Sequence, residues 1–379
     1  MSAGTRVGAF LGAYFGSIAL TAYMPLFYAD RGLSPEAIGQ VLGTATFLRI
    51  LSGPGWGNVA DRIGRRRPVL LVAGTIATVM ALLFVPARGF WPVLLVAAGQ
   101  GIAASAINPL ADSLALALAR EKRLDYGPVR AVGSATFMVA TACAGWVLNL
   151  VGSWLVPLLI ATGYGIATGL SRLLPEADSP PAAPRAWAGL APFRNRGFRL
   201  ALISSGLIQG SHAAYYGFAA LLWRSQGLSD TVIGLLLAEG IIVEILLFLR
   251  GRAVIERLGP AGLTGCAALA CTVRWGVTAT EPAVTVLAVV QLLHAGTFAM
   301  QHLSAMMTLS RHVPAERAAT AQALHNALGF GAPNGLMVLL AGWLYAHHGG
   351  MAFAAMAVSG GLALLVVPSL ARLERSAAV

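Results

Sequence analysis

Residues 57–66 read Gly57-Asn58-Val59-Ala60-Asp61-Arg62-Ile63-Gly64-Arg65-Arg66, and this stretch stands between two apolar segments at about 36–57 and 69–87. A helix needs about 20 apolar residues to cross the hydrocarbon core of a bilayer, and each flanking segment has roughly that length. The stretch between them is predicted to be a short polar loop outside the membrane. Asp61 lies near a helix end there and requires a cationic partner, which the neighbouring arginines supply.

The composition of the whole chain agrees with a membrane protein. It has 379 residues, of which 57% are hydrophobic and 11% are charged, whereas soluble domains carry about 25% charged residues. A soluble chain this apolar could not cover its surface with polar groups. The net charge is +11, but the basic residues stand in short runs between apolar segments. Membrane topology accounts for such runs, so we expect no nucleic-acid binding.

The pattern of apolar segments predicts an all-α membrane protein with twelve transmembrane helices in two pseudo-symmetric six-helix bundles. A polar stretch from Pro175 to Arg196, with five prolines, separates the sixth segment from the seventh. We therefore expect an N-terminal bundle at 1–172, a cytoplasmic linker at 173–198 and a C-terminal bundle at 199–379. The predicted spans are about 7–29, 36–57, 69–87, 91–118, 130–151, 154–171, 199–223, 229–249, 260–279, 283–310, 318–346 and 350–371.

The positive-inside rule gives these spans an orientation. With a cytoplasmic N-terminus, 20 of the 26 lysines and arginines fall in cytoplasmic segments. Only Arg31, Arg88 and Arg224 fall on the opposite side, and the remaining Arg49, Arg130 and Arg274 lie in or beside spans. We expect a multi-pass protein of the bacterial inner membrane with both termini in the cytoplasm.

An internal repeat connects the two predicted bundles. At an offset of 195 residues, Gly32-Leu33-Ser34 aligns with Gly227-Leu228-Ser229, and Asp61-Arg62-Ile63-Gly64 aligns with Glu256-Arg257-Leu258-Gly259. The alignment needs no gap across this window. Two related halves are typical of secondary transporters that arose by duplication.

The stretch at 57–66 resembles the G-x-x-x-D-R-x-G-R-R loop of the major facilitator superfamily, which lies between the second and third helices. The resemblance implies the twelve-helix fold of that superfamily and transport by alternating access. It also implies a conformational latch that joins one helix to the next. The latch residues that it indicates are Gly57, Asp61, Arg62, Gly64, Arg65 and Arg66.

Charged residues within spans are costly and usually functional, and the chain has three acids and three arginines there. Their equal numbers suggest pairing. Asp112 shares a helix face with Asn108, at a spacing of four residues, and Arg130 begins the next helix. This acid and arginine resemble the substrate-binding pair of lactose permease, with Asp in place of Glu. The shorter side chain enlarges the site and weighs against a sugar.

In the second half, Arg274, Glu244 and His294 resemble the proton-coupling cluster of the same permease. Two positions depart from its pattern, because Thr297 stands where a carboxylate is expected and Gln291 stands where a lysine is expected. Proton handling is therefore assigned to Glu244 or Glu239, or to the substrate itself. A static ion pair of Glu244 with an arginine is the alternative.

The seventh span carries Gln209, His212, Tyr215 and Tyr216 at helical spacing. The run from Gln209 to Phe218 resembles the phenylpropionic acid transporter branch of the superfamily, as do Arg274-Trp275-Gly276 and the segment from His294 to Met306. The resemblance covers most of the chain. It implies that these residues and Trp275 contact the substrate; a packed aromatic face is the alternative.

We expect proton-coupled import of a small organic solute such as an aromatic monocarboxylate, with Arg130 or Arg274 binding the carboxylate. The alternatives are a sugar or nucleoside symporter and, in another class, a non-transporting membrane sensor or assembly factor. No GK[ST], HExxH or GxSxG sequence and no metal-ligand spacing of cysteines occurs. We therefore expect no enzymatic activity, cofactor or metal. The expected partners are the solute, protons and the lipid bilayer, and the expected state is a monomer.

Overall fold

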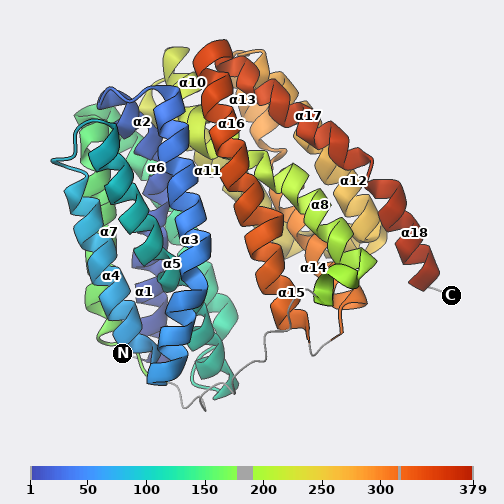
Figure 1. The fold of residues 1–379 in the computed structure, drawn as a ribbon, viewed down its shortest axis with the longest axis horizontal. Coiled ribbons are helices and arrows are strands. Elements are labelled where there is room, and N and C mark those ends of the chain that lie inside the picture. The colour runs from blue at the N-terminus through green and yellow to red at the C-terminus, as the bar shows by residue number, and fades with distance from the viewer. Residues whose placement is uncertain (1, 177–190, 315–316, 378–379) are drawn as a thin grey trace. The chain divides into compact units, whose positions relative to one another are not determined.

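The computed structural model describes residues 2–176, 191–314 and 317–377. Most of the predicted linker, 177–190, lies outside these residues. All regular secondary structure in the described residues is helical (Figure 1), so the prediction of an all-α protein is confirmed. Eight of its segments are long and apolar enough to cross a membrane.

The chain forms two compact units, and the first comprises residues 1–185 with 229–235. Within it α1 packs against α6 and α7, while α5 packs against both α3 and α4. Its helices are α1 (Ala3–Ala19), η1 (Leu20–Tyr23), α2 (Met24–Asp30), α3 (Pro35–Ile63), α4 (Arg66–Leu83), α5 (Phe90–Arg120), α6 (Tyr126–Val151), η2 (Ser153–Leu155) and α7 (Val156–Ser171).

The second unit comprises residues 186–228 with 236–379. Within it α12 packs against α17, and α8 packs against α14 and η7. Its helices are η3 (Ala191–Arg194), α8 (Arg196–Gly210), α9 (His212–Ala214), η4 (Tyr215–Ala219), α10 (Ala220–Ser225), α11 (Asp230–Arg250, shared with the first unit), α12 (Arg252–Ala279), α13 (Val284–Gln291), η5 (Ala295–Met300), α14 (Gln301–His312), α15 (Ala318–Leu324), η7 (His325–Gly331), α16 (Ala332–His348), η8 (Gly349–Met351), α17 (Ala352–Leu364) and α18 (Val367–Ala377).

Each of the twelve predicted spans coincides with one helix or with a run of consecutive helices. The polar loop predicted at 57–66 is shorter than expected, because α3 continues through Asp61 to Ile63 and α4 begins at Arg66. Gly64 ends α3 in a left-handed conformation, with φ of 68°, which glycine adopts without strain. Only Gly64 and Arg65 connect the two helices.

Among its described residues, the second unit has three helical runs with a π-helical turn: η4, η5 and η7. A buried histidine lies three residues before η4 (His212), directly before η5 (His294) and at the first position of η7 (His325). Turns of this kind are rare and often occur at functional sites.

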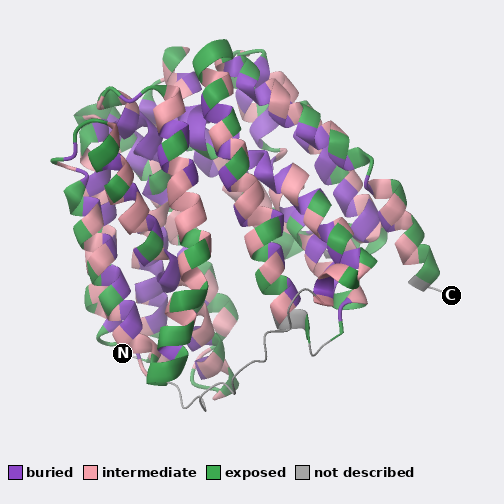
Figure 2. Cartoon of the chain, in the orientation of Figure 1, coloured by how far each residue is buried: buried purple, intermediate pink, exposed green. Residues whose placement is uncertain are grey.

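Exposed residues lie along the helices of both units (Figure 2), and many of them have large apolar side chains. Leu51, Leu249 and Leu365 are each 74% exposed. Such surface would be unfavourable in water, but it is the expected outer surface of helices that face lipid.

Candidate functional site

The first unit brings together the predicted acid and arginine of the substrate site. Asp112 on α5 and Arg130 on α6 lie 3.8 Å apart, between Oδ1 and Nε, and their side chains are 26% and 33% exposed. Asn108 lies one turn before Asp112 on α5. The Oδ1 atoms of Asn108 and Asp112 and Nη1 of Arg130 have no hydrogen-bond partner among the described residues. The Asp112 and Arg130 side chains also interact with Tyr126, and the unpartnered atoms leave acceptor and donor capacity available.

Phe15 of α1 is a further component of this site, and sequence reasoning did not identify it. Its buried ring lies under the guanidinium of Arg130, with Cζ 4.3 Å from the ring centroid. Gly133, one turn after Arg130, provides the space for the ring, because a Cβ at this position would lie 2.7 Å from Cδ2 of Phe15. The stacking orients the guanidinium by a cation–π interaction. No sequence pattern links the first span to Arg130.

In the second unit, Arg274 of α12 is fully buried and is bound by neutral acceptors. Its Nη1 donates to Nδ1 of His294 at 3.0 Å and to Oγ1 of Thr297 at 3.1 Å. Its Nη2 donates to Oε1 of Gln291 at 2.5 Å. Gln291 and Thr297 are the two positions that depart from the permease pattern, so these departures supply ligands to the arginine.

The predicted coupling acid Glu244 contacts this arginine indirectly. Its Oε2 lies 3.5 Å from Nε2 of His294. Within the described residues, Arg274 makes no ion pair with a carboxylate, and His294 lies between its guanidinium and Glu244. Glu239, also on α11 and partly buried, makes no ion pair with the described residues.

Residues of the predicted helix-seven face lie against one side of Arg274. The ring of Tyr215 lies under its guanidinium, with Cζ 4.6 Å from the ring centroid. Nε2 of His212 lies 3.1 Å from Oγ1 of Thr297, the same hydroxyl that accepts a hydrogen bond from Arg274. Trp275 is fully buried and donates to Ser211, so it packs in the interior of the unit.

The helical spacing predicted for this face is interrupted, because the π turn η4 begins at Tyr215. Tyr216 is consequently more exposed, at 38%, while Gln209 and Tyr215 are buried. The Nε2 of Gln209, the Nδ1 of His212 and the hydroxyl of Tyr215 have no hydrogen-bond partner among the described residues. These three polar atoms are candidates for contact with a solute or with water.

The predicted latch residues connect the helices of the first unit. Arg66 donates from Nε to Oγ of Ser113 at 2.8 Å, and this ties α4 to α5 one residue beyond Asp112. Arg65 lies 3.5 Å from Glu176, beyond the end of α7. Arg62 binds Asn58 within α3. Gly57 has open space around it. Asp61 is exposed without an ion pair to a described residue, because Arg62 contacts Asn58 and Arg65 contacts Glu176 instead; the predicted pairing of Asp61 with a neighbouring arginine is not seen in the described residues.

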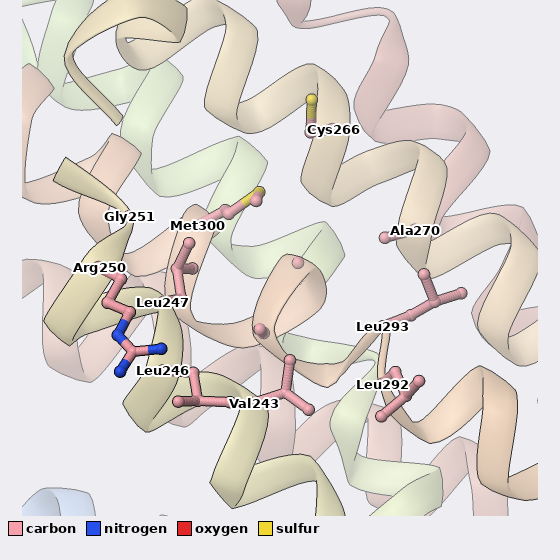
Figure 3. A pocket seen from close by; sticks show the side chains of 12 residues that line it. Val243, Leu246, Leu247, Arg250, Gly251, Cys266, Ala270, Leu292, Leu293 and Met300 are labelled. Atoms are coloured by element: carbon pink, nitrogen blue, oxygen red, sulfur yellow. The ribbon is translucent and has the colours of Figure 1, made fainter. Parts of the chain in front are cut away.

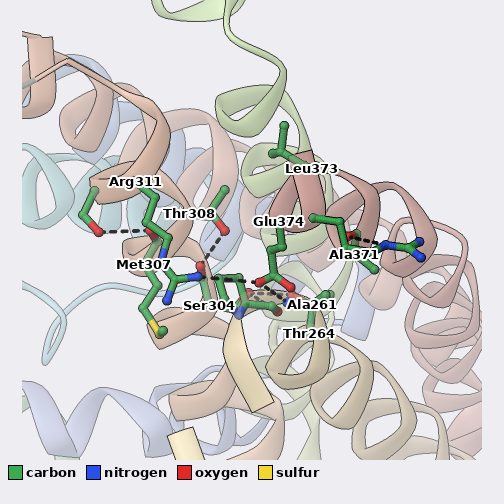
Figure 4. Close-up of polar contacts among 12 residues, drawn as sticks. Ala261, Thr264, Ser304, Met307, Thr308, Arg311, Ala371, Leu373 and Glu374 are labelled. Carbon is green, nitrogen blue, oxygen red and sulfur yellow. Dashed lines mark hydrogen bonds and ion pairs between the residues drawn. The ribbon is translucent and has the colours of Figure 1, made fainter. Parts of the chain in front are cut away.

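The second unit has a counterpart at Gly259, where α12 is kinked (φ 60°, ψ −179°). Glu374 of α18 accepts a hydrogen bond from the backbone N–H of Ala261 at 3.1 Å and lies 3.9 Å from Arg311 (Figure 4). In both units, therefore, a glutamate beyond the last span contacts the region around the repeated motif.

The chain is similar to a known protein family and to individual transporters. The MFS_1 like family matches residues 5–355. The probable 3-phenylpropionic acid transporter of Escherichia coli (strain K12) is 32% identical over 340 residues, which are 86% of this chain and 87% of that protein. The maltose permease of Geobacillus stearothermophilus is 26% identical over 375 residues, covering 96% of this chain and 93% of that protein.

Among solved structures, the nucleoside transporter NupG superimposes with a TM-score of 0.79 at 18% identity. The superposition covers 97% of this chain and 98% of that one. The likeness at this identity establishes the fold, and it confirms the predicted twelve-helix major facilitator architecture.

Proposed function

This chain belongs to the MFS_1 like family of multi-pass membrane transporters, and from that premise we propose that it imports an aromatic monocarboxylate together with a proton across the bacterial inner membrane. Alternating access of the two six-helix halves is the proposed mechanism. Its relatives indicate a transporter of small molecules and not an enzyme.

The substrate assignment rests on the contacts and exposure of the Arg130 guanidinium. Its guanidinium is oriented by Phe15, partly exposed, and held by Asp112 only at 3.8 Å. Nη1 has no hydrogen-bond partner among the described residues. A carboxylate can therefore displace Asp112 and accept two parallel hydrogen bonds from the guanidinium. Both terminal nitrogens of the alternative anchor, Arg274, are already bound and the side chain is fully buried, which favours Arg130.

The coupling assignment rests on the chain of contacts from Arg274 through His294 to Glu244. The side chain of Glu244 is 21% exposed, so protons can reach it, whereas His294 is nearly inaccessible. We assign the transported proton to Glu244. Its uptake would neutralise the acid and weaken its contact with His294, which gives protonation a structural effect on α11.

A sugar or nucleoside is the second candidate substrate. The unpartnered Oδ1 atoms of Asn108 and Asp112 favour it, because hydroxyl groups need acceptors. The maltose permease and NupG carry names that agree with this class. The third reading, a sensor or assembly factor, predicts no solute flux at all.

Uptake into proteoliposomes tests the proposal. Purified protein with an inward proton gradient should accumulate labelled 3-phenylpropionate, and the accumulation should vanish when an ionophore dissipates the gradient. Thermal-shift measurements with aromatic acids, maltose and nucleosides run in parallel, since a bound ligand raises the unfolding temperature. If only sugars or nucleosides stabilise the protein and are taken up, the substrate is a sugar or nucleoside and not an aromatic acid. If no solute is transported, the result favours the sensor or assembly factor.

A further inference from the structure

A groove in the second unit lies outside the residues discussed so far. It is formed by the C-terminal half of α11, by α12 and by the segment from Leu292 to Met300 (Figure 3). Its volume is about 550 Å³, within the range of roughly 300–1,000 Å³ that is usual for small-molecule sites. The walls are apolar, with Val243, Leu247 and Leu293 among them.

The groove has one charged side chain, Arg250, which is the last residue of α11. Arg250 is exposed and makes no ion pair with any described residue. Figure 3 shows it at one side of the apolar groove, next to Gly251 and Leu247. A cation without a partner at the edge of an apolar surface suits a ligand with an anionic head and an apolar tail.

The groove also opens to the outside of the unit. Leu246 and Leu292 are 46% and 45% exposed, and Cys266 on the α12 wall is exposed as well. The segments that carry Leu246 and Leu292 are both apolar enough to span the membrane. Exposed apolar side chains on membrane-spanning helices are the surface that hydrocarbon covers in a bilayer, and this argues for lipid as the occupant of the groove.

A glycine permits close helix packing at the wall of the groove. Gly296 lies against α12, where an added Cβ would be 2.9 Å from Cβ of Ala270. The close approach brings η5 onto α12 at this wall. Both residues line the groove.

We propose that this groove binds one acyl chain of an anionic glycerophospholipid whose phosphate pairs with Arg250. An acyl chain gains little by moving from other lipid tails into an apolar groove, so selectivity must come from the head group. Arginine binds phosphate through two parallel hydrogen bonds. One basic residue near the head groups contributes about 1 kcal/mol of attraction to anionic lipid, which corresponds to about a fivefold preference over a zwitterionic lipid.

Native mass spectrometry of the purified full chain tests the proposal. The protein is equilibrated with equimolar phosphatidylglycerol and phosphatidylcholine of the same acyl composition, and the lipid retained per protein is counted. We expect about fivefold more bound phosphatidylglycerol. Arg250→Gln should remove the preference, and Arg250→Lys should keep part of it. The matched control is Arg257→Gln, since Arg257 is exposed but does not line the groove.

A second variant tests the tail. Cys266→Phe places a large side chain in the groove and leaves Arg250 in place, so it should reduce retained phosphatidylglycerol to the level of Arg250→Gln. Unchanged retention in Cys266→Phe would overturn the acyl-chain site and leave a head-group contact. The proposal would be overturned if Arg257→Gln lost as much bound phosphatidylglycerol as Arg250→Gln, or if the unmodified protein showed no preference between the two lipids. A dimer that retains no lipid would overturn it as well.

Discussion

Arg274 donates a hydrogen bond to Nδ1 of His294 at 3.0 Å, and this contact defines the tautomer of the imidazole. A guanidinium can only donate, so Nδ1 must be the acceptor and carry no proton. In the neutral ring the proton then lies on Nε2, which faces Glu244 at 3.5 Å. A second proton on His294 would have to break the contact with Arg274. The contact with Arg274 therefore opposes a second proton on His294.

The first prediction concerns coupling. Glu244→Gln should abolish uphill accumulation and leave solute binding and exchange measurable, because an amide cannot alternate between charged and neutral forms. Counterflow and gradient-driven uptake in proteoliposomes measure the two properties separately. Glu239→Gln is the matched control on the same helix and should remain coupled. Undiminished uphill uptake by Glu244→Gln would transfer the role to Glu239 or Asp112.

The second prediction concerns the substrate carboxylate. Arg130→Ala should weaken binding by ~2–5 kcal/mol, which is roughly 30-fold to several thousand-fold. Arg130→Lys should be nearly as damaging, because an ammonium cannot reproduce the planar fork or its stacking on Phe15. Binding isotherms for 3-phenylpropionate measure the effect. For a sugar substrate Asp112→Asn should be the more damaging change. Carboxylate binding within about threefold of the unmodified protein in Arg130→Lys would make Arg274 the anchor.

The third prediction concerns the space between Phe15 and α6. Gly133→Ala places a methyl group 2.7 Å from Cδ2 of Phe15, and overpacking of this kind costs about 1–3 kcal/mol. A lower unfolding temperature and weaker solute binding should appear together, since the displaced ring no longer orients Arg130. Gly53→Ala is the control, because nothing lies within 4 Å of its added Cβ. Unchanged stability of Gly133→Ala would mean that Phe15 has another position.

The fourth prediction concerns the latch. Asp61→Asn and Arg66→Gln should both slow transport while solute affinity stays unchanged, since both residues lie at the proposed latch between α3 and α4 and not at the proposed solute site. Arg66→Gln removes the bond to Ser113 that joins α4 to α5. Arg67→Gln, at the neighbouring position, is the control. A loss of affinity at unchanged turnover would show that Asp61 is misassigned. Initial uptake rates over a range of solute concentrations separate the two parameters.

The fifth prediction concerns topology. Reporter fusions after Arg66, within 180–195 and at the C-terminus should all report a cytoplasmic location, because 20 of 26 basic residues then lie on that side. A periplasmic signal at the C-terminus would imply an odd number of spans and would contradict the twelve-helix topology in the cell.

The fold was predictable from the sequence because its determinants are local. Length and hydropathy alone mark a membrane helix, and each predicted span coincides with helical residues. The details at helix ends were less accessible. The loop predicted from Gly57 to Arg66 proved to be two residues long, since a polar helix end and a loop have the same composition.

The candidate site was predictable only in part. The resemblance to lactose permease paired Asp112 with Arg130, which lie 3.8 Å apart in the structure. Phe15 could not be found in this way, because it reaches Arg130 from a helix far away in sequence. The role of His294 as a bridge between Arg274 and Glu244 was equally hidden, because charge counting does not say which neutral residue stands between two charges. The roles assigned to these residues stay predictions.

The three π turns of the second unit affect how the sequences of the two halves of the chain should be aligned with each other. A π turn closes hydrogen bonds from i to i+5, so it holds one residue more than an α turn and leaves the helix beyond it facing as before. The ungapped alignment of 32–64 with 227–259 contains none of η4, η5 and η7. Outside that window, each π turn requires a one-residue gap against a regular helix. Deleting one residue from the π turn Tyr215–Ala219 should therefore preserve the direction of every side chain on α10. A one-residue deletion within the regular helix α1 would instead rotate the residues beyond it by about 100°.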